Sequence, residues 1–153
     1  MIKRNAFDFT GLSSLPGWES ILGLQFENLV LNNVQPLIEY LGLDRSLVLS
    51  AAPYRKSDTN AKQPDCDGAV SRGCQIDLLL QLKEAMYVVE IKRRKSIGPS
   101  IIDEVKRKIS RLPNPDGVSI RQVLFYDGEL SPSVIESGYF AAVIDAAEFF
   151  GLK

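Results

Sequence analysis

The sequence contains no histidine, and this absence excludes more chemistry than any other feature of its composition. Serine or cysteine nucleophiles that depend on a histidine base are excluded, as is a histidine general base. The only cysteines, Cys66 and Cys74, cannot complete a tetrahedral zinc site by themselves, and we expect both to be reduced bystanders. Any catalysis must therefore depend on carboxylates, lysine, tyrosine or a metal that prefers oxygen ligands.

Long apolar runs are also missing. None approaches the roughly 18 residues of a membrane span, and the N-terminus lacks the apolar core of a secretory signal. A chain of 153 residues that is 45% hydrophobic and 24% charged has the composition of one ordinary globular domain. We expect a cytoplasmic protein without a membrane partner, with an irregular arm at 1–17 and a single domain at 18–153.

Charge is unevenly distributed along the chain, although the net charge is only −1. Residues 92–111 contain eight lysines and arginines and two acids, so this stretch carries +6 and the remaining chain −7. A basic stripe beside an acidic pocket would suit a phosphodiester, whereas the alternative is an ordinary solvated patch whose helix-end cations complement the helix dipole. The cations that we expect to reach nucleic acid are Arg93, Arg94, Lys95, Lys106 and Lys108.

Residues 73–95 are the most informative stretch. Two short apolar runs, 76–82 and 86–91, flank a polar break at 83–84, which predicts a β-hairpin buried on both faces. Asp77 and Glu90 lie within these runs, although burying an ionised carboxylate costs several kcal/mol unless it is paired. Two acids within apolar strands therefore indicate a functional site.

The register of this hairpin brings the two acids together. A turn centred on Lys83 and Glu84 places Asp77 directly opposite Glu90, with about 4.5–5.5 Å between their Cβ atoms. Because side chains alternate along a strand, Lys92 projects to the same face as Glu90. Two opposed carboxylates repel each other, so the arrangement calls for a cation between them.

The pattern of Asp77, about a dozen residues, and then Glu90-x-Lys92 resembles that of the PD-(D/E)xK nuclease superfamily. The resemblance implies that the two acids hold Mg²⁺ or Mn²⁺ and that the lysine positions or activates the attacking water. Ile76 replaces the proline of the family's fullest pattern. The resemblance implies the catalytic residues Asp77, Glu90, Lys92 and Glu27, and the metal ligands Asp77, Glu90, Glu27 and the Ile91 carbonyl.

Glu27 lies on a largely apolar face of a predicted helix, where a carboxylate must be neutral, paired or bound to a metal. The segment 23–30 (Gly-Leu-Gln-Phe-Glu-Asn-Leu-Val) also resembles the opening helix of nuclease-like domains fused to AAA-type ATPases of bacteria and archaea. This likeness implies an AAA-type ATPase module, in the same chain or another one, as a partner. The sequence itself contains no Walker motif.

The sequence predicts both helices and strands along the chain. A helix over 18–41, interrupted near Gln35 by Pro36 and capped by Gly42, precedes a strand at 46–54. A polar segment at 55–72 is long enough to be functional or mobile, and it leads into the hairpin. A helix from Ser100 to the prolines at 113 and 115, a strand at 118–126, a short helix at 131–137, a strand at 139–144 and a closing helical turn follow.

This order predicts an α/β fold with a mixed central sheet flanked by helices, and it is similar to the αβββαβ core of restriction-endonuclease-like domains. The resemblance favours a magnesium-dependent nuclease that hydrolyses phosphodiester bonds of nucleic acid, DNA in the first place. The alternatives are a catalytically inactive nuclease-fold module that docks an ATPase, another protein or nucleic acid, and a nucleic-acid-binding domain that uses 92–111 alone. Structurally, the acids could instead cap backbone groups or form solvated ion pairs.

Overall fold

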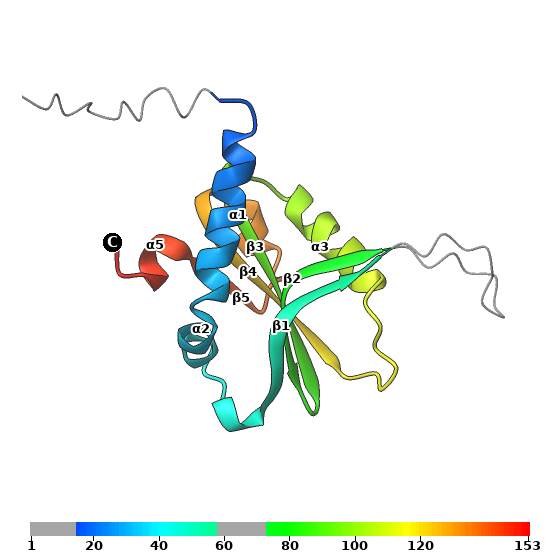
Figure 1. Cartoon of the computed structure of the whole chain (residues 1–153). Helices are drawn as coiled ribbons and strands as arrows, with labels where there is room; N and C mark the ends of the chain where they lie inside the picture. The colour runs from blue at the N-terminus through cyan, green and yellow to red at the C-terminus, as the bar shows by residue number, and fades with distance from the viewer. Residues whose placement is uncertain (1–14, 58–72) are drawn as a thin grey trace, which may run out of the picture.

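The computed structural model describes residues 15–57 and 73–153 (Figure 1). The chain has an α/β fold with a five-stranded mixed sheet in the order β1-β2-β3-β4-β5, so the predicted fold class is confirmed. The predicted arm over residues 1–14, most of the 55–72 segment, and Cys66 lie outside the described residues. The strands are β1 (Val48–Lys56), β2 (Cys74–Leu82), β3 (Ala85–Ile97), β4 (Ser119–Leu130) and β5 (Ala142–Asp145).

The first three strands form antiparallel pairs, whereas β3, β4 and β5 run parallel to one another. Helices cover both faces of the sheet, because alternate apolar side chains of the central strands need cover on each side. Within the described ranges, no helix is both long and apolar enough to cross a membrane. The helices are α1 (Trp18–Leu31), α2 (Val34–Tyr40), α3 (Ser100–Ser110), α4 (Pro132–Glu136) and α5 (Ala146–Phe149).

Among the described residues, three apolar clusters lie on the two faces of the sheet, where α1, α2 and α5 cover one face and α3 and α4 the other. On the first face, Phe26 of α1 packs against Phe125 of β4, with ring centroids 5.9 Å apart. On the second face, Ile101 and Val105 of α3 pack with Leu124 of β4. The side chains that β3 directs towards α3 are therefore held between the sheet and that helix.

The N-terminal helical segment divides at a different residue from the one predicted. The break lies at residues 32–33, and Pro36 occupies the first turn of α2, where its missing N–H needs no helical partner. Gly42 adopts φ 69° as expected of a helix-ending glycine. The N–H groups of Gly42 and Leu43 donate to the carbonyls of Glu39 and Ile38, which closes a Schellman motif.

Three strands extend further than the sequence predicts. β1 continues through Pro53 because it is an edge strand whose register shifts between Ala52 and Tyr54, and a bulge on an edge accommodates proline. β3 continues to Ile97, so the basic residues 92–95 lie within a strand. β4 continues past its predicted end at residue 126 as far as Leu130. Pro99 is the N-cap residue of α3, and no side chain caps this helix.

A substitution at Gly128 tests whether β4 extends beside β3 as far as this residue. Its φ of 132° disfavours any side chain, and a Cβ atom there would lie 1.7 Å from the Arg94 carbonyl oxygen of β3. We expect Gly128→Ala to lower the free energy of unfolding by about 2–4 kcal/mol, because the backbone of both strands must shift. Urea unfolding measures this loss.

Gly98→Ala is the matched control, since its Cβ atom would meet no atom within 4 Å. Its free energy of unfolding should stay within about 0.5 kcal/mol of wild type. Equal stability of the two variants would show that β3 and β4 do not approach each other at Gly128 as described.

Candidate active site

The sheet divides into two branches where β2 leaves β3. The strands pair from Gln81–Met86 to Leu78–Val89, in the register that the sequence predicts. Beyond that point β2 pairs only with β1, while β3 continues beside β4. Figure 1 shows β1 and β2 curving together away from β3 towards α3. The next residues along the register are Asp77 and Glu90, so the two acids lie at the fork between the strands.

The Asp77 side chain lies in the fork and bonds to the backbone of β3 there. Its side chain is buried, and its Oδ2 accepts a hydrogen bond from the Ile91 N–H at 2.9 Å. The carboxylate thus replaces the strand partner that β3 lacks beyond Val89. One alternative weighed from the sequence, an aspartate that caps a backbone group, is therefore correct for one oxygen. The other oxygen, Oδ1, lies 3.9 Å from Lys108 Nζ.

Glu90 is the more deeply buried acid, with 2% of its surface exposed, and it contacts two lysines. Its Oε2 lies 2.6 Å from Lys108 Nζ, and its Oε1 lies 3.4 Å from Lys92 Nζ. Lys92 in turn contacts Glu104 Oε1 at 2.6 Å. Acids and lysines therefore alternate through a group that we call the carboxylate cluster: Asp77, Glu90, Lys92, Glu104 and Lys108.

The contribution of α3 to this cluster was not predicted from the sequence. Lys108 was expected to contact nucleic acid and Glu104 was not singled out, whereas both side chains point to the fork. The available signal was their spacing, because residues four apart on a helix share a face, and these two flank the apolar stripe of Ile101 and Val105. Which strand that face would cover required the tertiary structure.

Glu27 and the Ile91 carbonyl, the other predicted ligands, both lie near the fork. Glu27 is half-buried on α1, and its negative charge acts on Asp77. Within residues 15–57 and 73–153 it has no ion pair or side-chain hydrogen bond. The Ile91 N–H points to Asp77, and the N–H and C=O of one strand residue point to the same side, so its carbonyl also faces the fork.

Burial is the largest influence on the pKa values of both acids. Burial raises the pKa of Asp77 above its ordinary value, and the charge of Glu27 adds to this rise, against the opposing effect of Lys108. Burial likewise raises the pKa of Glu90, and repulsion from Asp77 raises it further. Burial alone would lower the pKa of Lys108, but the carboxylates of Glu90 and Asp77 raise it. Lys108 therefore stays charged while the acids resist ionisation.

The donor set of the fork is compatible with a magnesium ion. If all groups are ionised, three carboxylates outweigh two ammonium groups and leave a charge of −1 on the cluster. In the described ranges no three Asp, Glu or Cys side chains gather closely enough to enclose a metal by themselves. Mg²⁺ commonly takes only one or two carboxylates and completes its shell with waters and substrate phosphates, so the pair Asp77–Glu90 is chemically sufficient.

The remaining predicted nucleic-acid contacts differ in how far they are free to bind. Arg93 forms ion pairs with Glu19 at 3.2 Å and Asp127 at 3.3 Å. Lys106 lies over the Tyr139 ring, 5.4 Å from its centroid. Arg94 and Lys95 are exposed on β3. Their side chains remain available to a ligand.

Comparisons with known proteins add little. No family model matches the chain, and no curated protein matches it. Among solved structures, the chain is similar to the crystal structure of AF1548, a protein of unknown function. The sequence identity is 12% and the TM-score is 0.44. The match covers 80% of this chain and 56% of that one, so the chain spans little more than half the length of that protein. A likeness this distant does not bear on activity.

The raised acid pKa values predict how stability depends on pH. An acid whose pKa is higher in the folded state costs stability as pH rises from the unfolded-state pKa, near 4, through the folded-state pKa. Asp77→Asn removes one charge while its amide oxygen can still accept the Ile91 hydrogen bond. We expect the variant to be more stable than wild type by about 1 kcal/mol at pH 8 and equally stable below about pH 3.5, measured by urea unfolding.

Asp116→Asn is the control, because Asp116 is an exposed acid in a turn, outside the helices and the cluster. Its stability should follow wild type at both pH values. If Asp77→Asn is instead less stable than wild type at pH 8, attraction to Lys108 outweighs burial and repulsion, contrary to the assignment above.

Proposed function

We propose that this chain is a magnesium-dependent nuclease domain of the PD-(D/E)xK type that hydrolyses phosphodiester bonds of nucleic acid. One observation carries the proposal: two buried carboxylates, Asp77 and Glu90, meet at the fork of the sheet with Lys92 beside them. Buried acids with raised pKa values and a specific charged partner are typical of functional sites. The positions of these residues follow the motif that the sequence resembles.

Each residue of the fork has a distinct role in this proposal. Asp77 and Glu90 would hold the ion, together with the Ile91 carbonyl and Glu27. When bound, Mg²⁺ supplies Lewis-acid stabilisation of the phosphodiester and a more acidic water. Lys92 would orient that water or neutralise developing charge, and Glu104 positions Lys92 through their 2.6 Å ion pair.

Lys108 makes the proposal more specific. Its ammonium group lies 2.6 Å from Glu90 and 3.9 Å from Asp77, between the two carboxylates where a divalent cation would also be attracted. Two cations repel each other at such separations, so Lys108 has to withdraw from Glu90 before Mg²⁺ enters. The long, flexible lysine side chain allows this movement. Metal binding is therefore expected to be weak in the absence of substrate.

The same contact also favours a second function. A lysine that permanently neutralises the acids would leave an inactive fold that serves as a docking module. Ile21 and Leu24 on α1 are 51% and 57% exposed, and an exposed apolar helix face is typical of contact surfaces. Such a module should keep its partner affinity in Asp77→Asn and Lys92→Ala. The AAA-type ATPase that the sequence resemblance implies would be one candidate partner.

Metal dependence separates the two functions. We expect calorimetry to detect Mg²⁺ binding to wild type at millimolar concentration and no binding to Asp77→Ala, because the variant loses one of two principal ligands. Plasmid and single-stranded DNA cleavage should require Mg²⁺ or Mn²⁺ and fall about 100- to 10,000-fold in Lys92→Ala. Asp103→Ala, which changes an exposed acid, should bind and cleave as wild type does.

Absence of Mg²⁺ binding to wild type at millimolar concentration would refute the nuclease and leave the docking module. Metal binding without cleavage of either DNA would refute autonomous activity and direct the search to RNA or to an ATPase partner.

Lys108→Met tests whether the lysine and the metal share one place. Without Lys108 the buried acids lose their closest cation, so the metal-free variant should be less stable than wild type by about 2–3 kcal/mol. Magnesium should then stabilise the variant more than it stabilises wild type, by at least about 1 kcal/mol at 10 mM. Thermal or urea unfolding with and without Mg²⁺ measures both effects.

Lys106→Met makes the same charge change two residues away, at a side chain that contacts Tyr139 rather than the cluster. Magnesium should affect this variant as it affects wild type. An equal magnesium effect in both variants would show that general charge, and not the fork, binds the ion.

A further inference from the structure

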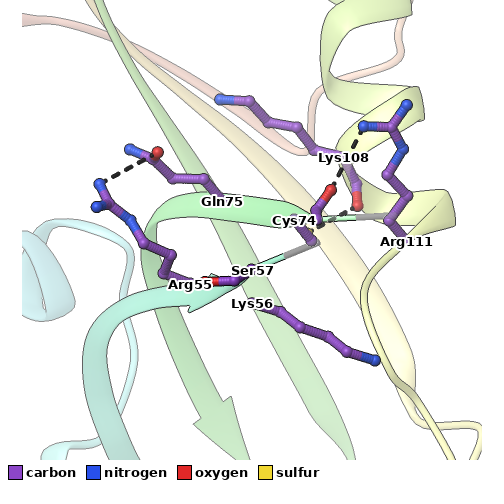
Figure 2. Close-up of a pocket in the computed structure, with 8 residues that line it drawn as sticks. Arg55, Lys56, Ser57, Cys74, Gln75, Lys108 and Arg111 are labelled. Carbon is purple, nitrogen blue, oxygen red and sulfur yellow. Dashed lines mark hydrogen bonds between the residues drawn. The ribbon is translucent and has the colours of Figure 1, made fainter. Parts of the chain in front are cut away.

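A pocket opens beside the carboxylate cluster, where the ends of β1 and β2 meet the C-terminal end of α3. Its volume is about 510 Å³, within the range of small-molecule sites and larger than a single phosphate group requires. Figure 2 shows basic side chains from β1 and α3 arranged around Cys74 and Gln75 of β2. The described lining consists of Arg55, Lys56, Ser57, Gly73, Cys74, Gln75, Lys108 and Arg111.

The charge of this lining selects an anion. Four of its described residues are cationic, and none of the described ones is acidic. The guanidinium groups are oriented by neutral partners: Arg55 donates to the Gln75 side chain at 3.3 Å, and Arg111 donates to the Gly73 carbonyl at 3.4 Å. Each guanidinium has five donors, so these bonds hold the groups in place without consuming their capacity. Neither arginine pairs with a carboxylate within the described ranges.

The lining also indicates what part of a ligand is recognised. Among the described lining residues there is no aromatic side chain on which a base could stack. Arginine and lysine without such a platform recognise phosphate groups, which carry no sequence information. The pocket is therefore suited to the backbone of a nucleic acid rather than to its bases.

Lys108 connects the pocket with the carboxylate cluster. The residue lines the pocket, while its ammonium group lies 2.6 Å from Glu90. Its main chain is held at the pocket by Cys74, whose thiol lies 3.2 Å from the Lys108 carbonyl oxygen. Lys108 therefore belongs both to the lining of the pocket and to the group that pairs with the acids at the fork.

We propose that this basic pocket binds backbone phosphates of the nucleic-acid strand that the fork cleaves. The choice of a polynucleotide rests on the proposed function, whereas the phosphate chemistry rests on the lining alone. A phosphate in the pocket positions the neighbouring part of the strand at Asp77 and Glu90. It also offers Lys108 a second anionic partner, which favours withdrawal of its ammonium group from Glu90.

Binding without metal tests the pocket independently of catalysis. Fluorescence anisotropy in EDTA measures the dissociation constant of labelled single-stranded DNA as a function of salt for the double variant Lys56→Gln/Arg111→Gln. We expect a rise of about tenfold or more and a decrease of about 1.4 in the slope of log K against log salt, because each lost phosphate contact removes about 0.7. Lys108 is left intact because it belongs to the cluster.

Lys83→Gln/Arg121→Gln is the matched control, with the same change in net charge at exposed residues near the opposite end of β2. It should bind DNA within about twofold of wild type. Equal weakening in the two double variants, or an unchanged salt slope in Lys56→Gln/Arg111→Gln, would overturn the proposal. Thermal unfolding of both variants verifies that they are folded.

Two further comparisons distinguish a polynucleotide from a free phosphate compound as the ligand, and failure of the pocket proposal from failure of the proposed nuclease function. Pyrophosphate that binds wild type and loses affinity in Lys56→Gln/Arg111→Gln, while DNA fails to bind, would replace the polynucleotide by a free phosphate compound and overturn the proposal as stated. Pocket-dependent DNA binding without magnesium-dependent cleavage would retain the pocket and refute the nuclease. If wild type cleaves DNA but Lys56→Gln/Arg111→Gln binds DNA as tightly as wild type does, the nuclease would be retained and the pocket proposal refuted.

Discussion

Two carboxylates that are buried opposite each other at the end of a hydrogen-bonded hairpin are the constraint on which the rest of this structure depends. Asp77 and Glu90 repel each other and have lost most of their water. Their ionised forms persist only if the surrounding protein supplies positive charge and hydrogen-bond donors. The Ile91 N–H and Lys92 of β3 and Lys108 of α3 supply these.

The fork of the sheet meets this electrostatic requirement through the backbone. If β2 and β3 remained paired beyond Leu78 and Val89, their own peptide groups would satisfy each other and no space would remain for a carboxylate. Because β2 turns away with β1, the Asp77 side chain can enter the ladder and accept from Ile91. The helix α3 then closes the gap on one side of the sheet and brings Glu104 and Lys108 to the exposed edge of the acids.

Lys108 gives this arrangement two possible states. Its ammonium group neutralises Glu90, and the same residue lines the basic pocket. An anion in the pocket and a cation at the fork both favour the state in which the lysine has withdrawn from the acids. Each ligand would favour the same withdrawal of Lys108 from Glu90. Binding of a phosphate backbone would therefore strengthen binding of magnesium, and the reverse.

The fold class, the hairpin with its register, and the meeting of Asp77 with Glu90 and Lys92 follow from local patterns in the sequence, because strand alternation and a two-residue turn leave one register. The predicted ends of β1 and β4, at residues 54 and 126, were wrong because edge position and cross-strand bulges decide how far a strand continues past a proline or glycine. Only the tertiary structure decided that Lys108 points to the acids and that Arg55, Lys56 and Arg111 share a pocket. The pocket brings together residues up to 56 positions apart, from Arg55 to Arg111, and this grouping depends on how α3 packs across the fork rather than on any periodicity within one element.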